Sequence, residues 1–305
     1  MELIPHEIKV LDTRIHYYTC GAPADSVPFS EARTPRAGKG SSLLFVHGHR
    51  ADALRYKGVI TYLAQFFQVY APDLPGFGKS PPLAIPHTME NLAKYLAAFA
   101  ERLTLKNFTL AGFSMGSIIA IHTALLIEPK LCQIILLGTP FDKNFLKMTT
   151  RKRKAMSKFF TLAAKNKTIL FIADKIQKNN KIMKSLVKRQ LPKDKQTKEI
   201  INYEVHFWQI MPMKVWFEAS ADLLQSSSAS KNFKIMTPTL LIETPHDHLL
   251  QVEKNLAALK KSFPNHKVIM FSLDRHVPYG DFNEDFVKSL ASNFEKYLFV
   301  CLRQG

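Results

Sequence analysis

The residues with the clearest chemical meaning form the pentapeptide Gly112-Phe113-Ser114-Met115-Gly116. It follows a short apolar run typical of a buried strand and precedes a run with helical spacing. A serine in a tight strand-to-helix turn needs small neighbours, because its strained backbone approaches the adjacent strand and helix closely. Such a turn presents the serine at the carboxyl end of a sheet, with the next backbone N–H free to bind an oxyanion. We therefore predict that Ser114 is a nucleophile; the alternative is a tight glycine turn with an incidental serine.

A hydroxyl is a poor nucleophile at neutral pH, so Ser114 needs a base within hydrogen-bond reach. Of the eleven histidines, His276 is the best placed, because it follows the last predicted strand of the chain. The base in turn needs a carboxylate that fixes its tautomer and stabilises the imidazolium. Asp247 follows the preceding predicted strand, so parallel strands would bring the two loops to one edge of a sheet. We predict a catalytic set of Ser114, Asp247 and His276.

These residues must be positioned by a framework, and the chain predicts one of alternating strands and helices. An alternating pattern at residues 7–18 predicts an opening hairpin, and residues 21–40, rich in Pro, Ala and Ser, predict a loop. The predicted strands are 43–46, 69–71, 108–111, 133–137, 239–242 and 268–271, and the predicted helices are 53–67, 89–103, 117–127, 252–261 and 282–297. This alternation implies an α/β fold with a mostly parallel central sheet flanked by helices.

The alternation stops near Pro140 and resumes near Pro238, which indicates an insertion. We predict a core of residues 1–140 and 233–305 and a helical cap of residues 141–232. Within the cap, residues 151–198 hold sixteen basic side chains against two acidic ones, and so carry most of the net charge of +17.

A rough apolar stripe runs through this basic segment, comprising Ile172, Ile176, Met183, Leu186 and Val187. We prefer a cap helix that buries the stripe and solvates its lysines. The alternatives are a surface for anionic lipid or for an acidic carrier protein. Nucleic acid ranks last, because no recognition motif accompanies the charge.

Four blocks in order resemble the α/β-hydrolase superfamily over about two-thirds of the chain. They are Phe45-Val46-His47-Gly48, the turn Asp73-Leu74-Pro75-Gly76-Phe77-Gly78-Lys79-Ser80, the serine pentapeptide, and the late Asp and His loops. The resemblance is to esterase- and lipase-like serine hydrolases with a helical cap. It implies an oxyanion hole made by the backbone N–H groups of His49 and Met115.

The chain departs from the family pattern beside the proposed base and acid. Arg275 stands where the family usually has glycine before the catalytic histidine, and Thr244 replaces a common glycine in the acid loop. Asp142 follows the predicted strand at 133–137 and is a second candidate acid, because some relatives place the acid there. We prefer Asp247 and interpret Asp142 as a helix N-cap.

A serine in the elbow argues against the dehalogenases and epoxide hydrolases of this fold, which use aspartate there. The expected function is hydrolysis of a carboxylic ester through an acyl-enzyme, with an acyl-carrier-protein methyl ester or a lipid-type ester as candidate substrates. A carbon–carbon bond hydrolase with the same three residues and a non-catalytic binding module are the alternatives.

The remaining expectations concern the cap aromatics, cofactors and location. We expect the aromatic group that includes Trp208 and Trp216 to form part of the core of the cap. These two residues are also our candidates for contacting an apolar acyl chain. No cofactor or metal is expected, because the three cysteines lack metal-ligand spacing. With no signal peptide and no long apolar run, we expect a cytoplasmic protein with reduced thiols.

Overall fold

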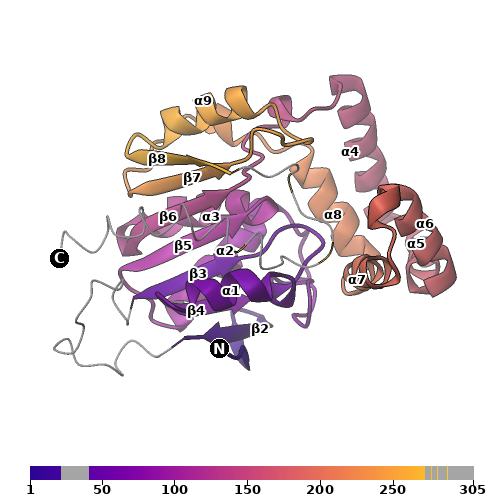
Figure 1. Cartoon of the computed structure of the whole chain (residues 1–305), viewed down its shortest axis with the longest axis horizontal. Helices are drawn as coiled ribbons and strands as arrows, with labels where there is room; N and C mark the ends of the chain where they lie inside the picture. The colour runs from indigo at the N-terminus through magenta and orange to yellow at the C-terminus, as the bar shows by residue number, and fades with distance from the viewer. Residues whose placement is uncertain (22–40, 272–275, 277–279, 281–286, 288–305) are drawn as a thin grey trace.

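The computed structural model describes residues 1–21, 41–271, 276, 280 and 287 (Figure 1). The predicted loop at 21–40 and helix at 282–297 lie almost entirely outside the described residues, as do Arg275 and Cys301. No helix in the described part of the chain is long and apolar enough to cross a membrane.

A mixed eight-stranded sheet forms the centre of the molecule, in the order β1-β2-β4-β3-β5-β6-β7-β8. The strands are β1 (Ile4–Val10), β2 (Thr13–Cys20), β3 (Ser42–Val46), β4 (Gln68–Pro72), β5 (Phe108–Phe113), β6 (Leu131–Leu137), β7 (Thr239–Glu243) and β8 (His266–Met270). The β1–β2 hairpin and the β2–β4 pair are antiparallel, and every later pair is parallel. The predicted α/β fold with a mostly parallel sheet is confirmed.

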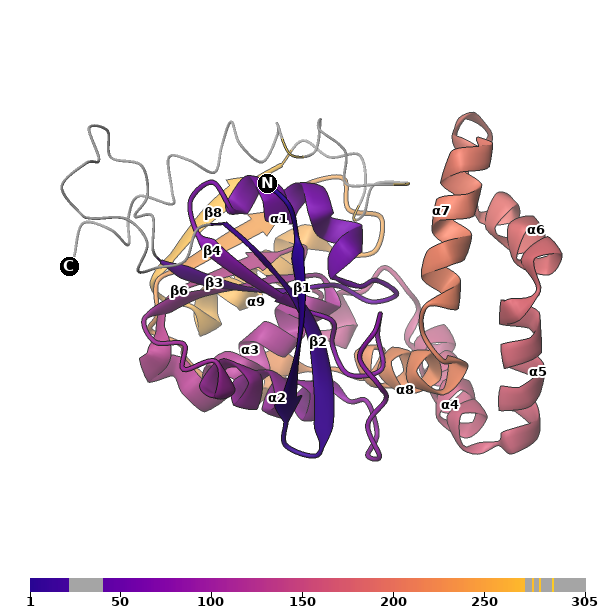
Figure 2. The same ribbon diagram turned by 90° about the horizontal axis from the view of Figure 1, so that it is seen from below.

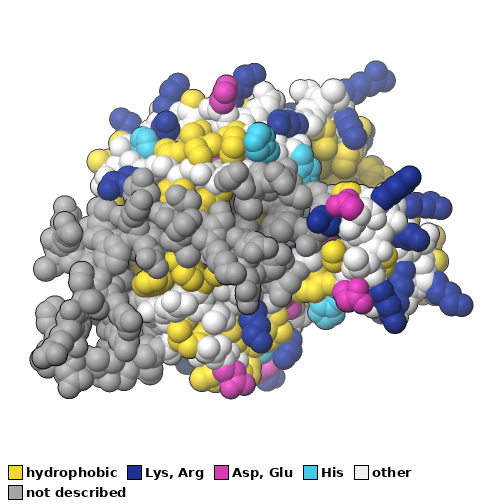
Figure 3. Space-filling view, in the orientation of Figure 1, with side chains coloured by type: hydrophobic (Ala, Val, Ile, Leu, Met, Phe, Trp, Pro, Cys, Tyr) yellow, Lys and Arg dark blue, Asp and Glu magenta, His cyan; other side chains and the backbone are white. Residues whose placement is uncertain are grey.

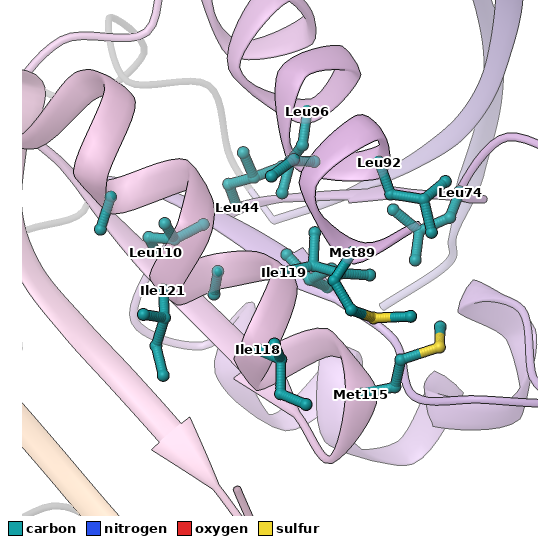
Figure 4. Packing of buried hydrophobic residues seen from close by; sticks show 14 of the residues in the cluster. Leu44, Leu74, Met89, Leu92, Leu96, Leu110, Met115, Ile118, Ile119 and Ile121 are labelled. Carbon is teal, nitrogen blue, oxygen red and sulfur yellow. The ribbon is translucent and has the colours of Figure 1, made fainter. Parts of the chain in front are cut away.

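Helices cover both faces of this sheet, which explains why the inner strands β3, β5, β6 and β7 are mostly apolar and buried. The flanking helices are α1 (Lys57–Leu63), α2 (Met89–Arg102), α3 (Met115–Ile127) and α9 (Val252–Ser262). Successive side chains of a strand point to opposite faces. Leu44 and Val46 of β3 therefore pack in one core with α2, α3 and α9, whereas Leu43 and Phe45 pack with α1 in the other. Figure 4 shows the first core, where α2 and α3 lie over the sheet.

One predicted helix is shorter than expected. The structure replaces the predicted helix at 53–67 by a 3₁₀ turn at Ala53–Tyr56 and α1, which ends at Leu63. Asp52 begins this segment by accepting a hydrogen bond from the backbone N–H of Arg55 at 3.0 Å. The short geometry keeps the segment close to the end of β3, where the candidate site lies.

Five helices follow β6 and precede β7, in the segment where the insertion is predicted. They are α4 (Thr150–Lys165), α5 (Lys167–Lys178), α6 (Asn180–Gln190), α7 (Lys198–Gln209) and α8 (Met213–Leu223). Figures 1 and 2 show them gathered at one end of the sheet, with α5 and α6 farthest from it. They have small cores of their own, one made by α4, α5 and α8 and the other by α6 and α7.

The apolar stripe predicted in the basic segment is divided by these cores. Met183 and Val187 are buried between α6 and α7. Ile172, Ile176 and Leu186 are exposed. The interpretation that the cap buries the whole stripe is therefore wrong, because α5 and α6 turn part of it toward solvent.

Candidate active site

Ser114 occupies the sharp turn between β5 and α3, with φ 53° and ψ −118°. This is a strained conformation for a residue with a side chain. The turn is possible only because glycines flank it. A Cβ on Gly116 would lie 2.2 Å from the carbonyl oxygen of Val46, and one on Gly112 would lie 2.5 Å from the carbonyl oxygen of Gly116. The backbone N–H of Ser114 donates to the carbonyl of Leu137 at 2.8 Å, which fixes the turn against β6.

The structure brings Ser114, His276 and Asp247 into one hydrogen-bonded row. His276 Nε2 lies 2.7 Å from Ser114 Oγ, and His276 Nδ1 lies 2.5 Å from Asp247 Oδ2. An ionised carboxylate only accepts hydrogen bonds, so Nδ1–H donates to Asp247 and Nε2 accepts from the serine hydroxyl. Asp247 follows β7, and both Asp247 and His276 are buried. The turn after β5, the segment after β7 and His276 thus meet at this point.

The environment of Asp247 favours its ionised form. Burial acts to raise its pKa, but the hydrogen bond and charge of His276 outweigh burial, together with two backbone donors. These donors are the N–H groups of Leu249 and Leu250, at 2.7 and 3.1 Å from Oδ1. The net pKa of Asp247 is below its ordinary value. Lys147 Nζ also donates to the Asp247 carbonyl at 2.6 Å, which fixes the acid loop.

Asp142, the second candidate acid, is held elsewhere. Its Oδ1 accepts from the backbone N–H of Asn144 at 2.8 Å, at the start of a short 3₁₀ helix. Its Oδ2 accepts from the hydroxyl of Ser227. The structure therefore places Asp142 as a helix N-cap, and it is Asp247 that hydrogen-bonds His276.

The loop after β3 lies against the serine turn, and His47 fixes it. The Nδ1–H of His47 donates to the carbonyl of Gly48 at 2.8 Å, and Nε2 accepts from the backbone N–H of Leu74 at 3.0 Å. Burial lowers the pKa of His47, which matches a neutral ring with one donor and one acceptor. Within the described residues, the backbone N–H groups of His49 and Met115 donate to no other group. Their oxyanion role stays a prediction.

The turn at 73–80 has a structural role. Asp73 Oδ1 accepts from the backbone N–H of Ala53, and Oδ2 accepts from that of Lys79, both at 3.0 Å. Asp73 Oδ2 also lies 3.1 Å from His16 Nδ1, and Ser80 Oγ donates to the Asp73 carbonyl at 2.7 Å. The turn is thereby joined to β2 and to the segment that follows the oxyanion loop.

The two tryptophans lie near the loop after β3, and Trp216 also packs on the small core formed by α4, α5 and α8. Their ring centroids are 5.5 Å apart, and the ring of Trp216 is 6.2 Å from that of His49. Trp216 also packs at 5.0 Å on Phe160 of α4. Trp208 lies under the guanidinium of Arg50, whose Cζ is 4.4 Å from the ring centroid. Both rings are thus near the site, and their contact with substrate stays a prediction.

Glu204 on α7 connects this helix to the segment after β3 and to Gly280, and it was missed from the sequence. Its carboxylate accepts from Arg50 Nη2 at 3.1 Å, from Arg55 Nη2 at 2.8 Å and from the backbone N–H of Gly280 at 3.3 Å. Arg50 follows the predicted oxyanion donor, and Gly280 is four residues beyond His276. The available signal was an acidic residue on the apolar stripe of a helix, between Ile200 and Phe207.

A second buried carboxyl, Glu243, lies behind His276. Together with Gly138, Phe271 and other residues, it lines a cavity of about 20 Å³ that also contacts the His276 ring. Burial and the nearby charge of Asp247 raise the pKa of Glu243 to about 8, although the backbone N–H of Thr139 donates to it. The raised pKa favours the protonated, neutral form of Glu243. Among the residues described, no cluster of three His, Cys, Asp or Glu side chains could hold a metal ion.

The chain belongs to the α/β hydrolase fold family, whose model matches residues 42–282. It is similar to a pimeloyl-[acyl-carrier protein] methyl ester esterase of Legionella pneumophila, with 25% identity over 251 residues, which cover 82% of this chain and 93% of that protein. Among solved structures it resembles an esterase from Exiguobacterium antarcticum, with a TM-score of 0.70, 17% identity and coverage of 97% and 99% of the two chains. It also resembles a thermophilic esterase from Thermogutta terrifontis, with a TM-score of 0.68, 18% identity and coverage of 96% and 98%.

Proposed function

We propose that this protein is a serine esterase that hydrolyses a carboxylic ester through an acyl-enzyme. The observation that carries the proposal is the hydrogen-bonded row from Ser114 through His276 to Asp247. A serine hydroxyl, a neutral imidazole and a buried carboxylate in this order are the groups that acyl transfer needs. The similarity to a methyl ester esterase over most of both chains supports an ester as the substrate.

In the proposed reaction, Ser114 Oγ attacks the ester carbonyl carbon while its proton passes to His276 Nε2. The carbonyl oxygen becomes an oxyanion, which the backbone N–H groups of His49 and Met115 would stabilise. His276 then gives the proton to the departing alcohol, and an acyl-serine remains. Water attacks this acyl group and loses a proton to His276, which then gives that proton to Ser114 Oγ as the acyl–oxygen bond breaks, releasing the carboxylic acid and the free serine. Asp247 stabilises the imidazolium in both halves.

We further propose that residues 141–232 act as a cap that shapes the substrate site. The contacts of α8 with the oxyanion loop support this, because Ser220 Oγ lies 3.2 Å from His49 Nε2. Trp216, from the same helix, packs beside His49. An apolar acyl chain would lie against Trp208 and Trp216, with its carbonyl at Ser114. Candidate substrates are therefore esters with an apolar acyl part, including acyl-carrier-protein methyl esters.

An activity-based probe tests the nucleophile. A fluorophosphonate should label the native protein and fail to label Ser114→Ala, and the exposed control Ser185→Ala on α6 should be labelled like the native protein. Labelling should also be lost in His276→Ala, because the serine then lacks its base. A folded protein that resists the probe would indicate a binding module, and equal labelling of Ser114→Ala would contradict the proposed nucleophile.

A substrate panel tests the reaction. We expect turnover of p-nitrophenyl esters, with a preference among acyl lengths that Trp216→Ala reduces. The panel should include a pimeloyl-carrier-protein methyl ester and the corresponding free methyl ester. It should also include a vinylogous diketone, since a carbon–carbon bond hydrolase can use the same three residues. Faster cleavage of the diketone than of every ester would replace the esterase proposal.

A further inference from the structure

Helices α4, α5 and α6 expose an unusual set of apolar side chains. Phe171 is 59% exposed, Leu162 57% and Phe159 53%. Seven large apolar residues are exposed on these helices, namely Phe159, Leu162, Phe171, Ile172, Ile176, Ile182 and Leu186. Single exposed apolar residues are normal in proteins, but a group of this size on adjacent helices indicates a surface that something else covers.

Basic side chains are interleaved with these apolar ones. Helices α4, α5 and α6 expose twelve of them, namely Arg151, Lys152, Lys154, Lys158, Lys165, Lys167, Lys175, Lys178, Lys181, Lys184, Lys188 and Arg189. Asp174 is the one acidic residue of the three helices. Its carboxylate accepts from the backbone N–H of Met213 at 3.3 Å. Within the described part of the chain, no carboxylate pairs with any of the twelve. Figure 3 shows Lys and Arg side chains projecting around this end of the molecule.

A basic groove lies along the α4 side of this surface. Its volume is about 470 Å³, and its lining includes Lys143, Arg153, Lys154, Lys158, Leu162 and Gln225. No carboxylate lines it. Arg153 is buried and donates to the carbonyl of Leu224, and the side-chain amide of Gln225 donates to Ser157. The three lysines beside one apolar side chain match a phosphate headgroup next to an acyl chain.

The positions of the seven exposed apolar residues favour a membrane over a nucleic acid or an acidic protein as the partner. Leu162 is the one of the seven that lines the groove, and the other six stand on open helix surface. A nucleic acid would use the cations but leave these six side chains in water. An acidic protein would need a complementary rigid surface wrapped over three helices. A bilayer deforms around such a surface, because its headgroups meet the lysines while apolar side chains enter the acyl boundary.

We propose that the outer face of α4, α5 and α6 docks on anionic phospholipid membranes, with Phe171 and Ile172 among its inserted side chains. The groove beside α4 holds a lipid phosphate. The docking is peripheral, and it does not depend on the proposed esterase reaction, because it concerns binding by a surface that contains none of the proposed catalytic residues.

Vesicle co-sedimentation of the full-length protein tests the proposal. We expect binding to mixed phosphatidylcholine–phosphatidylglycerol vesicles, weak binding to pure phosphatidylcholine, and release by high salt. The quadruple variant Lys175→Glu, Lys178→Glu, Lys181→Glu, Lys184→Glu should bind the mixed vesicles at least about tenfold more weakly. The matched control reverses four exposed lysines of the core, Lys57, Lys94, Lys254 and Lys260, and should bind much like the native protein.

A second pair of variants tests how much the apolar side chains contribute to vesicle binding. Phe171→Ser with Ile172→Ser should weaken binding at least about tenfold, because two large side chains no longer leave water. Leu125→Ser with Leu126→Ser changes two exposed apolar residues of α3 and should have little effect. Thermal unfolding and turnover of a short soluble ester establish that each variant is folded.

Three results would overturn the proposal. They are absence of binding to the anionic vesicles, equal losses in the cap and control variants, and vesicle binding that the serine pair leaves unchanged. Binding of a purified acidic acyl-carrier protein without any vesicle binding would assign the surface to a protein partner instead. Loss of esterase activity with intact vesicle binding would reject the proposed function and leave the docking surface in place.

Discussion

Glu204 and Arg55 are 149 residues apart in the chain and joined by a 2.8 Å hydrogen bond. Both side chains are almost fully buried, with side-chain exposures of 7% and 5%. The same carboxylate accepts from Arg50 and from the backbone N–H of Gly280. Glu204 of α7 therefore connects this helix to Arg50 and Arg55, which follow β3, and to Gly280, four residues beyond His276. We therefore expect Glu204 to influence the positions of the proposed oxyanion donor and base.

Glu204→Gln should reduce both stability and turnover. The variant leaves buried Arg55 without its counter-charge, and breaking a buried pair in this way costs about 3–5 kcal/mol of unfolding free energy. At temperatures where the variant is folded, kcat should fall about ten- to a hundredfold, since Arg50, Arg55 and Gly280 lose their common acceptor beside the site. Urea denaturation and kcat per probe-titrated site measure the two effects. Glu199→Gln, exposed on the same helix, is the control. A stability loss with native kcat per titrated site would restrict Glu204 to a structural role.

Asp247→Asn should lower kcat by about 10³- to 10⁴-fold, because the amide no longer stabilises the imidazolium and can favour the wrong tautomer. Asp142→Asn is the matched variant. Its carboxylate accepts from Asn144 and Ser227, away from His276, so its kcat should be close to native even if the protein is less stable. Steady-state kinetics on a short ester compare the two. The reverse outcome would make Asp142 the functional acid.

Two substitutions of His49 distinguish the role of its backbone N–H from the role of its side chain. Burial and the charge of Arg50 lower the pKa of His49 to about 3, so its ring is neutral and should not contribute to the pH profile. His49→Ala keeps the backbone N–H and should lower kcat by less than about tenfold. By comparison, loss of one oxyanion donor lowers kcat by about 10²- to 10³-fold. His49→Pro removes the N–H and should show that larger loss. Equal effects of the two variants, at equal melting temperature, would contradict a backbone oxyanion donor.

Glu243→Gln should change how stability depends on pH. The pKa of Glu243 is raised from 4.5 to about 8. Between these values the folded protein keeps a proton that the unfolded chain releases, so the free energy of unfolding falls as pH rises. This group contributes a slope of up to about 1.4 kcal/mol per pH unit. The glutamine variant lacks it and should gain stability relative to the native protein across this window. Urea denaturation at several pH values measures the difference, with Glu253→Gln, exposed on α9, as the control. A difference that is constant with pH would refute the raised pKa.

Much of the fold was predictable because its signals are local. Each strand buried on both faces is an apolar run, and the serine turn carries both glycines that its close contacts require. The predicted acid and base follow from their places after the last two strands of the described sheet. Their distances from Ser114 could not be predicted, because these depend on strand order and register.

The contacts of the cap were not predictable. Ile172 and Met183 belong to the same apolar stripe in the sequence, yet Ile172 is exposed and Met183 is buried. The difference arises from how α5 and α6 turn relative to α7, which periodicity does not encode. Glu204 was missed for a related reason, since its partners come from distant segments and no local pattern connects them.

The Glu204 contacts bear on whether residues 141–232 can be replaced by the corresponding segment of a relative. A chimera that replaces residues 141–232 by another cap would remove the acceptor for Arg50, Arg55 and Gly280 at once. The recipient core would then carry two orphaned cations beside its reaction centre. We therefore expect a functional graft of this segment to keep Glu204 together with both arginines, or to replace all three.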